Sequence, residues 1–219
     1  MARVGVVLSG CGVYDGAEIH ESVITLLSLD EQGADVVCMA PSIDQMHVIN
    51  HATGDVTGGT RNVLVESARI ARGEVTDIAQ VQASEIDALV FPGGFGAAKN
   101  LCDFAVNGAE CTVNADVARL VRDMHAAGKP LGFACIAPAM AAAIFKGSGI
   151  EVNLTIGSDA DTAAAIQQMG AVHTACSVTE ATLDEPNRIS TTPAYMLAQR
   201  IRDVKVGIDQ MVKQVLAMI

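Results

Sequence analysis

A buried strand leads through one cysteine directly into a helix in the stretch Gly132-Phe133-Ala134-Cys135-Ile136-Ala137-Pro138. The residues before Cys135 are apolar, and Pro138 stands in the first helical turn, where no backbone N–H is needed. At such a junction the positive end of the helix dipole favours a thiolate, so we expect the pKa of the Cys135 thiol to fall. Burial as an inert core residue is the alternative, because free cysteine is among the most buried residue types.

Short apolar segments alternate with helical segments along the whole chain. The predicted strands are Val4–Leu8, Asp35–Met39, Ala88–Phe91, Leu131–Ala134 and Ile189–Thr191. The predicted helices lie near Glu18–Gln32, Asn62–Arg72, Asp116–Ala127, Ile136–Phe145, Ala160–Met169 and from Ala194 towards the C-terminus. This alternation predicts an α/β protein with a mostly parallel sheet covered on both faces. No break in composition marks a second domain, so residues 1–219 are expected to form a single domain.

Two segments fit this alternation less well. Pro41–Gly59 reads as an inserted hairpin, with Val48–Asn50 and Asp55–Thr57 as its arms, and Asn100–Val113 is irregular. Both segments are expected either to shape the mouth of a pocket or an oligomer contact, or to be plain surface excursions.

The charge balance excludes several classes of partner. The chain has 14 basic and 25 acidic residues, for a formal net charge of −11, without any basic cluster. Nucleic acid and anionic membrane surfaces are therefore poor partners. The longest nearly apolar run, Leu131–Phe145, contains glycine and proline and is shorter than the roughly 18 residues that suggest a membrane span.

The six cysteines and five histidines show no metal-binding or disulfide pattern. No C-x-x-C or H-E-x-x-H motif occurs, so we expect free thiols, no metal site and no cofactor. Leu8-Ser9-Gly10-Cys11 looks like a lipoprotein processing site, but too few apolar residues precede it for a signal peptide. A cytoplasmic location is then the default expectation.

Three loops that carry candidate functional residues follow predicted strands. They should meet at one edge of the sheet, where open α/β folds bind ligands. They are Ser9–Glu21, Pro92–Asn100 and the turn at Cys135. Because glycine lacks a Cβ, Gly93 and Gly94 let the backbone approach a ligand closely. Their N–H groups, with that of Ile136, are candidates for an oxyanion hole, and an ordinary turn is the alternative.

Two carboxylates, Glu18 and Glu21, compete for the role of acid or base. Asp15 can cap the following helix with Glu18 at its third position, which explains Glu18 structurally. Glu21 has no such explanation, yet it lies away from the apolar face that Ile19, Val23, Leu26 and Leu27 define. An exposed carboxylate is therefore the reading that helical phase favours for Glu21.

Long motifs give the chain a family resemblance. The motif Gly16-Ala17-Glu18-x-x-Glu21, Pro92-Gly93-Gly94 and the Cys135 turn together resemble the class I glutamine amidotransferase-like superfamily, which includes PfpI-type proteins and glyoxalase III enzymes. The segments Leu8–Gly16, Pro92–Leu101 and Thr191–Leu197 more specifically resemble the enhancing lycopene biosynthesis proteins (ElbB), also called sigma cross-reacting proteins or isoprenoid biosynthesis proteins with an amidotransferase-like domain.

The resemblance implies a flavodoxin-like three-layer sandwich in which a nucleophile elbow carries Cys135 and Glu21 lies beside it, against the helical phase. The chain also departs from the wider pattern. A glutamine amidotransferase has a histidine and a glutamate late in the chain, whereas this one has Thr191-Thr192-Pro193 there. Thr155 stands where several relatives place another histidine, and Phe133 is bulky for an elbow. Glutaminase activity is therefore not expected.

The resemblance implies a cofactor-independent glyoxalase that converts glyoxal or methylglyoxal, a small aldehyde substrate, to the 2-hydroxy acid. Cys135 would form a hemithioacetal and Glu21 would move a proton through an enediol, with His20 as a weak candidate for assistance. The alternative is a regulatory protein with a redox-sensitive thiol, linked to isoprenoid metabolism. A homodimer is expected, since dimers are the commonest assembly. Cys11 either lies near Cys135 or packs under its own loop.

Overall fold

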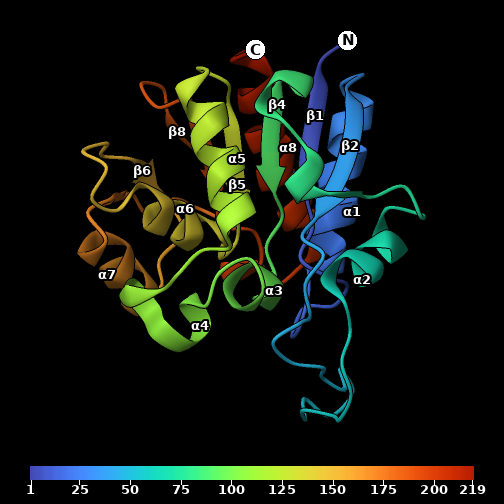
Figure 1. Cartoon of the computed structure of the whole chain (residues 1–219). Coiled ribbons are helices and arrows are strands. Elements are labelled where there is room, and N and C mark those ends of the chain that lie inside the picture. Colours follow the sequence, from blue (N-terminus) through green and yellow to red (C-terminus); the bar gives the residue numbers. More distant parts are fainter.

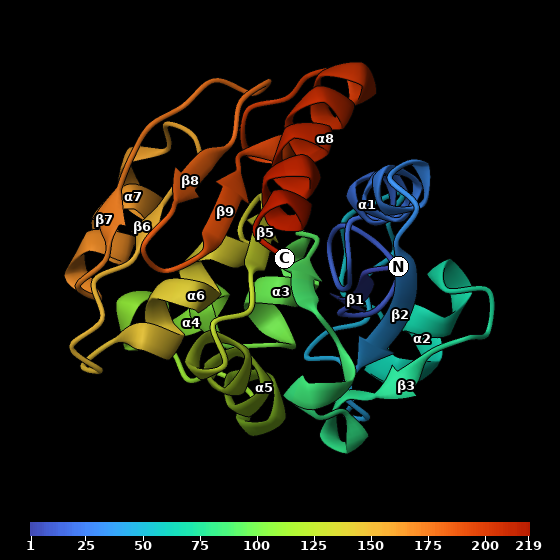
Figure 2. The same cartoon turned by 90° about the horizontal axis from the view of Figure 1, so that it is seen from above.

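A computed structural model describes all residues 1–219 and contains a seven-stranded sheet in the order β3-β2-β1-β4-β5-β9-β8. The strands are β1 (Arg3–Val7), β2 (Asp35–Ala40), β3 (Thr76–Asp77), β4 (Ala88–Phe91), β5 (Leu131–Ala134), β8 (Thr182–Asp184) and β9 (Ile189–Thr192). All neighbouring strands are parallel except β8 and β9, which pair antiparallel at the edge. A separate parallel pair, β6 (Asn153–Leu154) and β7 (Val172–His173), lies beside β8 of this sheet (Figure 2).

Helices cover both faces of the sheet. They are α1 (Ile19–Glu31), α2 (Val63–Ile70), α3 (Phe95–Lys99), α4 (Phe104–Asn107), α5 (Ala115–Ala126), α6 (Ala137–Phe145), α7 (Ala160–Gln168) and α8 (Ile201–Ala217). Figure 2 shows α1 and α8 on one face and α5 and α6 on the other. This confirms the predicted three-layer α/β sandwich. No helix combines the length and apolarity that a membrane crossing requires.

Two hydrophobic clusters hold the layers together. The larger one joins the sheet to α5 and α6 and contains the fully buried rings of Phe91 and Phe133, and the smaller one joins it to α1 and α8. Because both faces of the central strands are buried, β4 and β5 are continuous apolar runs rather than alternating ones. The sequence supplies this core with aliphatic residues in place of the tryptophan it lacks.

The predicted hairpin is present in the segment between β2 and α2. Ile49 and Val56 form an antiparallel bridge, and Thr57 N–H donates to the Val48 carbonyl oxygen at 2.7 Å. The hairpin, α3 and α4 all lie at the lower end of the molecule in Figure 1, which is the edge where the parallel strands end.

The end of the chain differs from the sequence-based expectation. The final helix begins at Ile201 rather than Ala194, and Ala194–Met196 form only a short 3-10 turn. Ala194 has a φ of +43°, a left-handed conformation that an α-helix cannot continue. Because residues 194–196 are not part of the final helix, they extend along the sheet edge towards the loops of the candidate site.

Candidate active site

Cys135 sits on a sharp turn between β5 and α6, with a φ of +60°. Its N–H donates to the Thr192 carbonyl oxygen at 2.9 Å, which ties the turn to the end of β9. A residue with a Cβ is strained in this conformation, and such strain collects at functional sites. The nucleophile elbow is therefore formed, although Phe133 is bulky, because the Phe133 ring packs into the core and stacks on Phe91 with 4.9 Å between centroids.

Glu21 is completely buried beside Cys135. Its Oε2 accepts a hydrogen bond from Gly93 N–H at 2.8 Å, and its Oε1 accepts one from Tyr195 N–H at 3.0 Å. The Cys135 thiol lies beside the same carboxylate and acts to stabilise its charge. The structure thus brings Glu21 and Cys135 together, as the resemblance implied.

The exposed position that helical phase favours for Glu21 is wrong. Ile19, Val23 and Leu27 are more than 40% exposed, so the stripe interpreted as the buried face of α1 is its outer face. The inner face also carries buried polar residues, which are Glu21, Ser22, Thr25 and Ser28. The buried carboxylate of Glu21 is hydrogen-bonded by the loops that contain Gly93 and Tyr195. The periodicity of a single helix contains no information on such tertiary contacts.

Burial controls the protonation of the pair. It raises the pKa of Glu21 to about 7, even though the N–H groups of Tyr195 and Gly93 and the Cys135 thiol all stabilise the carboxylate. Burial and the neighbouring Glu21 also raise the pKa of the Cys135 thiol well above its ordinary value. The expected fall in the thiol pKa is therefore wrong, because the helix end contributes less than the loss of water and the nearby negative charge. The resting pair is a thiol beside a carboxylate of near-neutral pKa.

Two backbone N–H groups act on the sulfur. Those of Gly94 and Ile136 interact with the Cys135 thiol and act to lower its pKa. Gly93 has no room for a side chain, since a Cβ there would lie 2.6 Å from Glu21 Oε2 and 2.9 Å from Cys135 Sγ. Gly94 has a φ of +96° and packs against the backbone of Ala17 and Glu18. The glycine pair thus lets the Pro92 loop touch both functional side chains.

Glu18 and Asp15 have roles other than the predicted ones. Glu18 itself caps α1, because its Oε2 accepts from Glu21 N–H at 2.6 Å, and its side chain also lines the pocket. Asp15 is buried and accepts from Ile49 N–H of the hairpin at 2.7 Å. The predicted capping by Asp15 is therefore wrong, since the helix begins at Ile19 and Asp15 is bound by a distant segment.

His20 and Cys11 interact with groups other than Cys135. The Nδ1 of the exposed His20 is 2.7 Å from the Tyr195 hydroxyl, so its ring is directed towards Tyr195. Cys11 is half-buried, and the charged groups that act on it include Arg69 and Glu66 of α2. All six cysteines are free, and the structure contains no cluster of three or more metal-binding side chains.

Buried threonines occupy the positions where the family resemblance implies a histidine in amidotransferases. Thr191 Oγ1 accepts from Thr155 N–H at 2.9 Å, and the Thr192 hydroxyl donates to the Glu180 carbonyl oxygen at 2.8 Å. These hydroxyl groups are therefore used to hold the backbone around β9. Glu21 is the acid–base side chain in contact with Cys135.

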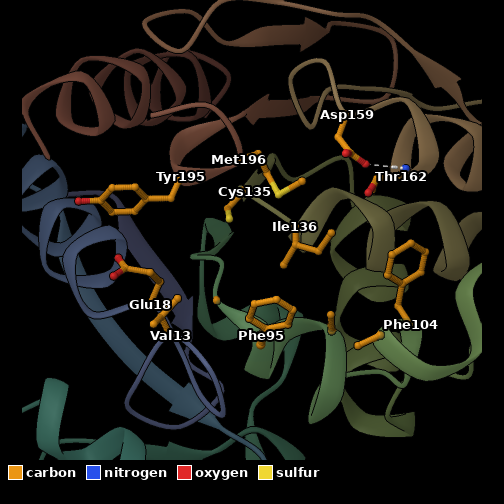
Figure 3. Close-up of a pocket in the computed structure, with 13 residues that line it drawn as sticks. Val13, Glu18, Phe95, Phe104, Cys135, Ile136, Asp159, Thr162, Tyr195 and Met196 are labelled. Carbon is orange, nitrogen blue, oxygen red and sulfur yellow. Dashed lines mark hydrogen bonds between the residues drawn. The ribbon is translucent and has the colours of Figure 1, made fainter. Parts of the chain in front are cut away.

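A cavity of about 480 Å³ opens over Cys135. Figure 3 shows the cysteine between Glu18 on one side and Asp159 on the other, with Ile136 and Phe95 close by. Most of the lining is apolar, and further lining residues come from α4 and α7. Sequence reasoning missed this outer wall, which comprises Phe104, Ala105, Asp159, Thr162 and Met196, because none of these residues belongs to a chemical motif.

Comparisons with known proteins give close relatives over the full chain. The human "Glutamine amidotransferase-like class 1 domain-containing protein 3, mitochondrial" is 49% identical over 98% of this chain and 82% of its own length. The zebrafish (Danio rerio) "ES1 protein, mitochondrial" is 34% identical over 99% of this chain and 86% of its own length. No family model matches the chain.

Solved structures agree with the fold. An isoprenoid biosynthesis protein with an amidotransferase-like domain from Ehrlichia chaffeensis is 38% identical, with a TM-score of 0.94 over 100% of this chain and 99% of that one. DJ-1beta of Drosophila melanogaster is 18% identical, with a TM-score of 0.55 over 99% of this chain and 95% of its own, and shows the fold alone. The chain therefore has the flavodoxin-like fold of DJ-1, ThiJ and PfpI proteins.

The names of the relatives contradict the expected cytoplasmic location. The human, rat and zebrafish proteins are all named as mitochondrial. The expectation was a default from the lack of a recognised signal, and nothing in a folded α/β domain encodes the compartment in which it works.

Proposed function

The chain belongs to the family of glutamine amidotransferase-like class 1 domain-containing protein 3 and its ES1 homologues, and from this premise we propose that it is a cofactor-independent glyoxalase acting through Cys135 and Glu21. The observation that carries the proposal is the buried pair itself, a thiol beside a carboxylate whose pKa is about 7. A base with a pKa near the working pH is the most effective proton carrier.

The first step is addition of sulfur to the aldehyde. Cys135 Sγ bonds to the aldehyde carbon C1 of a 2-oxoaldehyde while Glu21 takes the thiol proton, which is then delivered to the former aldehyde oxygen. The product is a hemithioacetal. The N–H groups of Gly94 and Ile136, which act on the Cys135 thiol, would stabilise the negative charge that develops on that oxygen.

The second step moves a proton between the two substrate carbons. Glu21 removes the proton from C1 and delivers it to the C2 oxygen, which gives an enediol. It then takes the proton of the C1 hydroxyl and delivers it to C2, so that C1 is oxidised and C2 is reduced. The result is a thioester of the 2-hydroxy acid, and water then cleaves the C1–S bond to release the acid and the thiol. The conversion is an internal redox reaction that consumes only water, so it requires no external electron carrier.

The regulatory alternative has less physical support. Redox-sensing cysteines are solvent-accessible and have a low pKa. Cys135 is buried, and both burial and Glu21 raise the pKa of its thiol. The environment of Cys135 therefore favours a nucleophile that Glu21 deprotonates when the substrate reacts. It does not favour a sensor thiol that is ionised at rest.

Three finer assignments complete the proposal. Within the family we assign the chain to the enhancing lycopene biosynthesis (ElbB) type, which the 38% identity to the Ehrlichia isoprenoid biosynthesis protein supports. Residues 1–219 are proposed to act as a single domain, consistent with one sheet that takes strands from residue 3 to residue 192. A homodimer stays a prediction.

Lactate formation from methylglyoxal tests the proposed function. The wild-type protein should produce lactate faster than an equal concentration of a free thiol. Glu21→Gln, which keeps the shape of the side chain but removes the base, should lower kcat/KM by about 10²–10⁴-fold. The exposed Glu74 provides the matched control, since Glu74→Gln should leave kcat/KM unchanged. Turnover by the wild type no better than that of free thiol would overturn the proposal.

A further inference from the structure

The cavity over Cys135 is much larger than methylglyoxal. At the roughly 30 Å³ that one water molecule occupies in the liquid, a cavity of about 480 Å³ has room for about 16 non-hydrogen atoms. Methylglyoxal fills about a third of this space. A site evolved only for glyoxal or methylglyoxal would leave the remainder to water, although proteins generally shape their pockets to bury most of the ligand.

The unused part of the cavity is mostly apolar. Beyond Cys135 its wall includes Phe104 and Ala105 of α4, Ile136 of the elbow and Met196 of the 3-10 turn. Asp159 and Thr162 are its polar members. Phe95 lies at the side of the opening and is 47% exposed. A hydrocarbon chain that extends from the reacting carbons along this wall would remove apolar surface from water on both partners, which is favourable.

The charged groups of the cavity disfavour an anionic substrate. Glu18 and Asp159 face it from opposite sides, and no lysine, arginine or histidine is among the lining residues. Hydrogen bonds from Thr162 lower the pKa of Asp159, so this side chain is a carboxylate at neutral pH. The ammonium of Lys99, beside Phe95, donates to the Tyr14 carbonyl oxygen at 3.1 Å and lies over the Phe95 ring. A phosphate or carboxylate in the cavity would therefore meet two negative charges.

We propose that the preferred substrates are 2-oxoaldehydes that carry an uncharged hydrocarbon chain of about six carbons, bound along the wall formed by Phe104, Ala105, Ile136 and Met196. This inference rests on the proposed glyoxalase activity and adds the substrate class. The chemistry at C1 and C2 is unchanged, and the chain contributes binding that is equal in the ground and transition states, which lowers KM more than it raises kcat.

Three aldehydes test the preference in the intact protein. They are methylglyoxal, 2-oxooctanal and an analogue of 2-oxooctanal whose chain ends in a carboxylate. Full burial of the added methylenes would raise kcat/KM up to about a thousandfold, and because the cavity is open we expect about 10- to 100-fold for 2-oxooctanal over methylglyoxal. The carboxylate analogue should be at least about tenfold worse than 2-oxooctanal. Equal kcat/KM values for the three would overturn the inference.

Two tryptophan variants locate the binding wall. Ala105→Trp fills the space along α4 and should reduce the ratio of the two kcat/KM values, 2-oxooctanal to methylglyoxal, to below about threefold. Ala126→Trp places the same side chain at an exposed position at the end of α5 and should keep the wild-type ratio. A ratio that Ala105→Trp leaves unchanged would contradict the proposed path of the chain.

A measurement without turnover separates this inference from the proposed function. The assay is the rate at which iodoacetamide alkylates Cys135, measured by mass spectrometry. We expect 1-octanol to slow this alkylation at concentrations at least about tenfold lower than those at which 1-butanol or octanoate has the same effect. Protection by octanol in a protein that converts no aldehyde would leave the pocket preference standing and overturn the glyoxalase assignment. Methylglyoxal turnover without selective protection by octanol would support the glyoxalase and overturn the pocket preference.

Discussion

Gly93→Ala places a single methyl group between the two functional side chains. Its Cβ would lie 2.6 Å from Glu21 Oε2 and 2.9 Å from Cys135 Sγ, with the Cβ of Cys135 closer still. Non-bonded heavy atoms settle at about 3.5–4.0 Å, so the carboxylate must move by roughly 0.9–1.4 Å and the sulfur by roughly 0.6–1.1 Å. A displacement of this size in a catalytic pair lowers the rate by about 10²-fold, and overpacking should cost roughly 1–3 kcal/mol of stability.

The assay for Gly93→Ala is kcat/KM for methylglyoxal, with thermal unfolding measured on the same sample. Gly58→Ala is the matched control, because a Cβ at Gly58 meets no atom within 4 Å. The control should keep both wild-type activity and stability. A folded Gly93→Ala protein with kcat/KM within about threefold of the wild type would refute the reasoning that contact between Cys135 and Glu21 is required.

Three further predictions concern the buried acid and the core. The kcat/KM of the wild type should fall about tenfold per pH unit below an apparent pKa of about 7 and level off above it, because Glu21 must be ionised to accept the thiol proton; a flat profile between pH 5 and 9 would contradict this. Burial raises the pKa of Glu21 from its ordinary value of 4.5 to about 7, so its contribution to the free energy of unfolding is largest below pH 4.5 and falls by about 3 kcal/mol up to pH 7. The free energy of unfolding of Glu21→Gln, measured with denaturant, should accordingly rise relative to that of the wild type as the pH rises through this window. A difference that stays constant with pH would contradict the raised pKa of Glu21. Phe133→Ala should lower the free energy of unfolding by about 3–5 kcal/mol, since the ring is fully buried and stacked on Phe91; a loss under 1 kcal/mol in the same assay would be inconsistent with that packing.

The sequence predicted those parts of the molecule that local signals encode. The apolar run before Cys135 and the proline after it predicted a strand, an elbow and a helix, all of which are present. The arms of the hairpin at Val48–Asn50 and Asp55–Thr57 were likewise readable from short extended segments around a turn. In each case the residues that determine the conformation are close together in the sequence.

The burial of Glu21 could not be read from α1 alone. The hydrogen bonds that its carboxylate accepts come from Gly93 and Tyr195, which are 72 and 174 residues away in the sequence. The outer apolar residues of α1 gave a misleading phase, and the family resemblance supplied the correct answer. The predicted capping of α1 by Asp15 was wrong for the same reason, since the hydrogen-bond partner of Asp15, Ile49, belongs to the distant hairpin.

The thiol pKa shows a different limit of sequence reasoning. Position at the start of α6 predicted a thiolate favoured by the helix end. Ile136 N–H does act to lower the thiol pKa, but the position gave no measure of burial, which raises it. The cavity wall from α4 and α7 was also unpredictable, because its members are ordinary apolar and capping residues that only the tertiary fold brings to Cys135. Motifs therefore gave the candidate reacting groups but not the shape of the space in front of them.

Lactate production from methylglyoxal by Cys135→Ser tests the central claim most directly. Cys11→Ser is the matched control, since Cys11 also follows a strand at this edge of the sheet but does not line the cavity. We predict that Cys135→Ser reduces the rate to that of the reaction without protein, whereas Cys11→Ser retains the wild-type rate. Equal lactate production by Cys135→Ser and the wild type would contradict the assignment of Cys135 as the nucleophile.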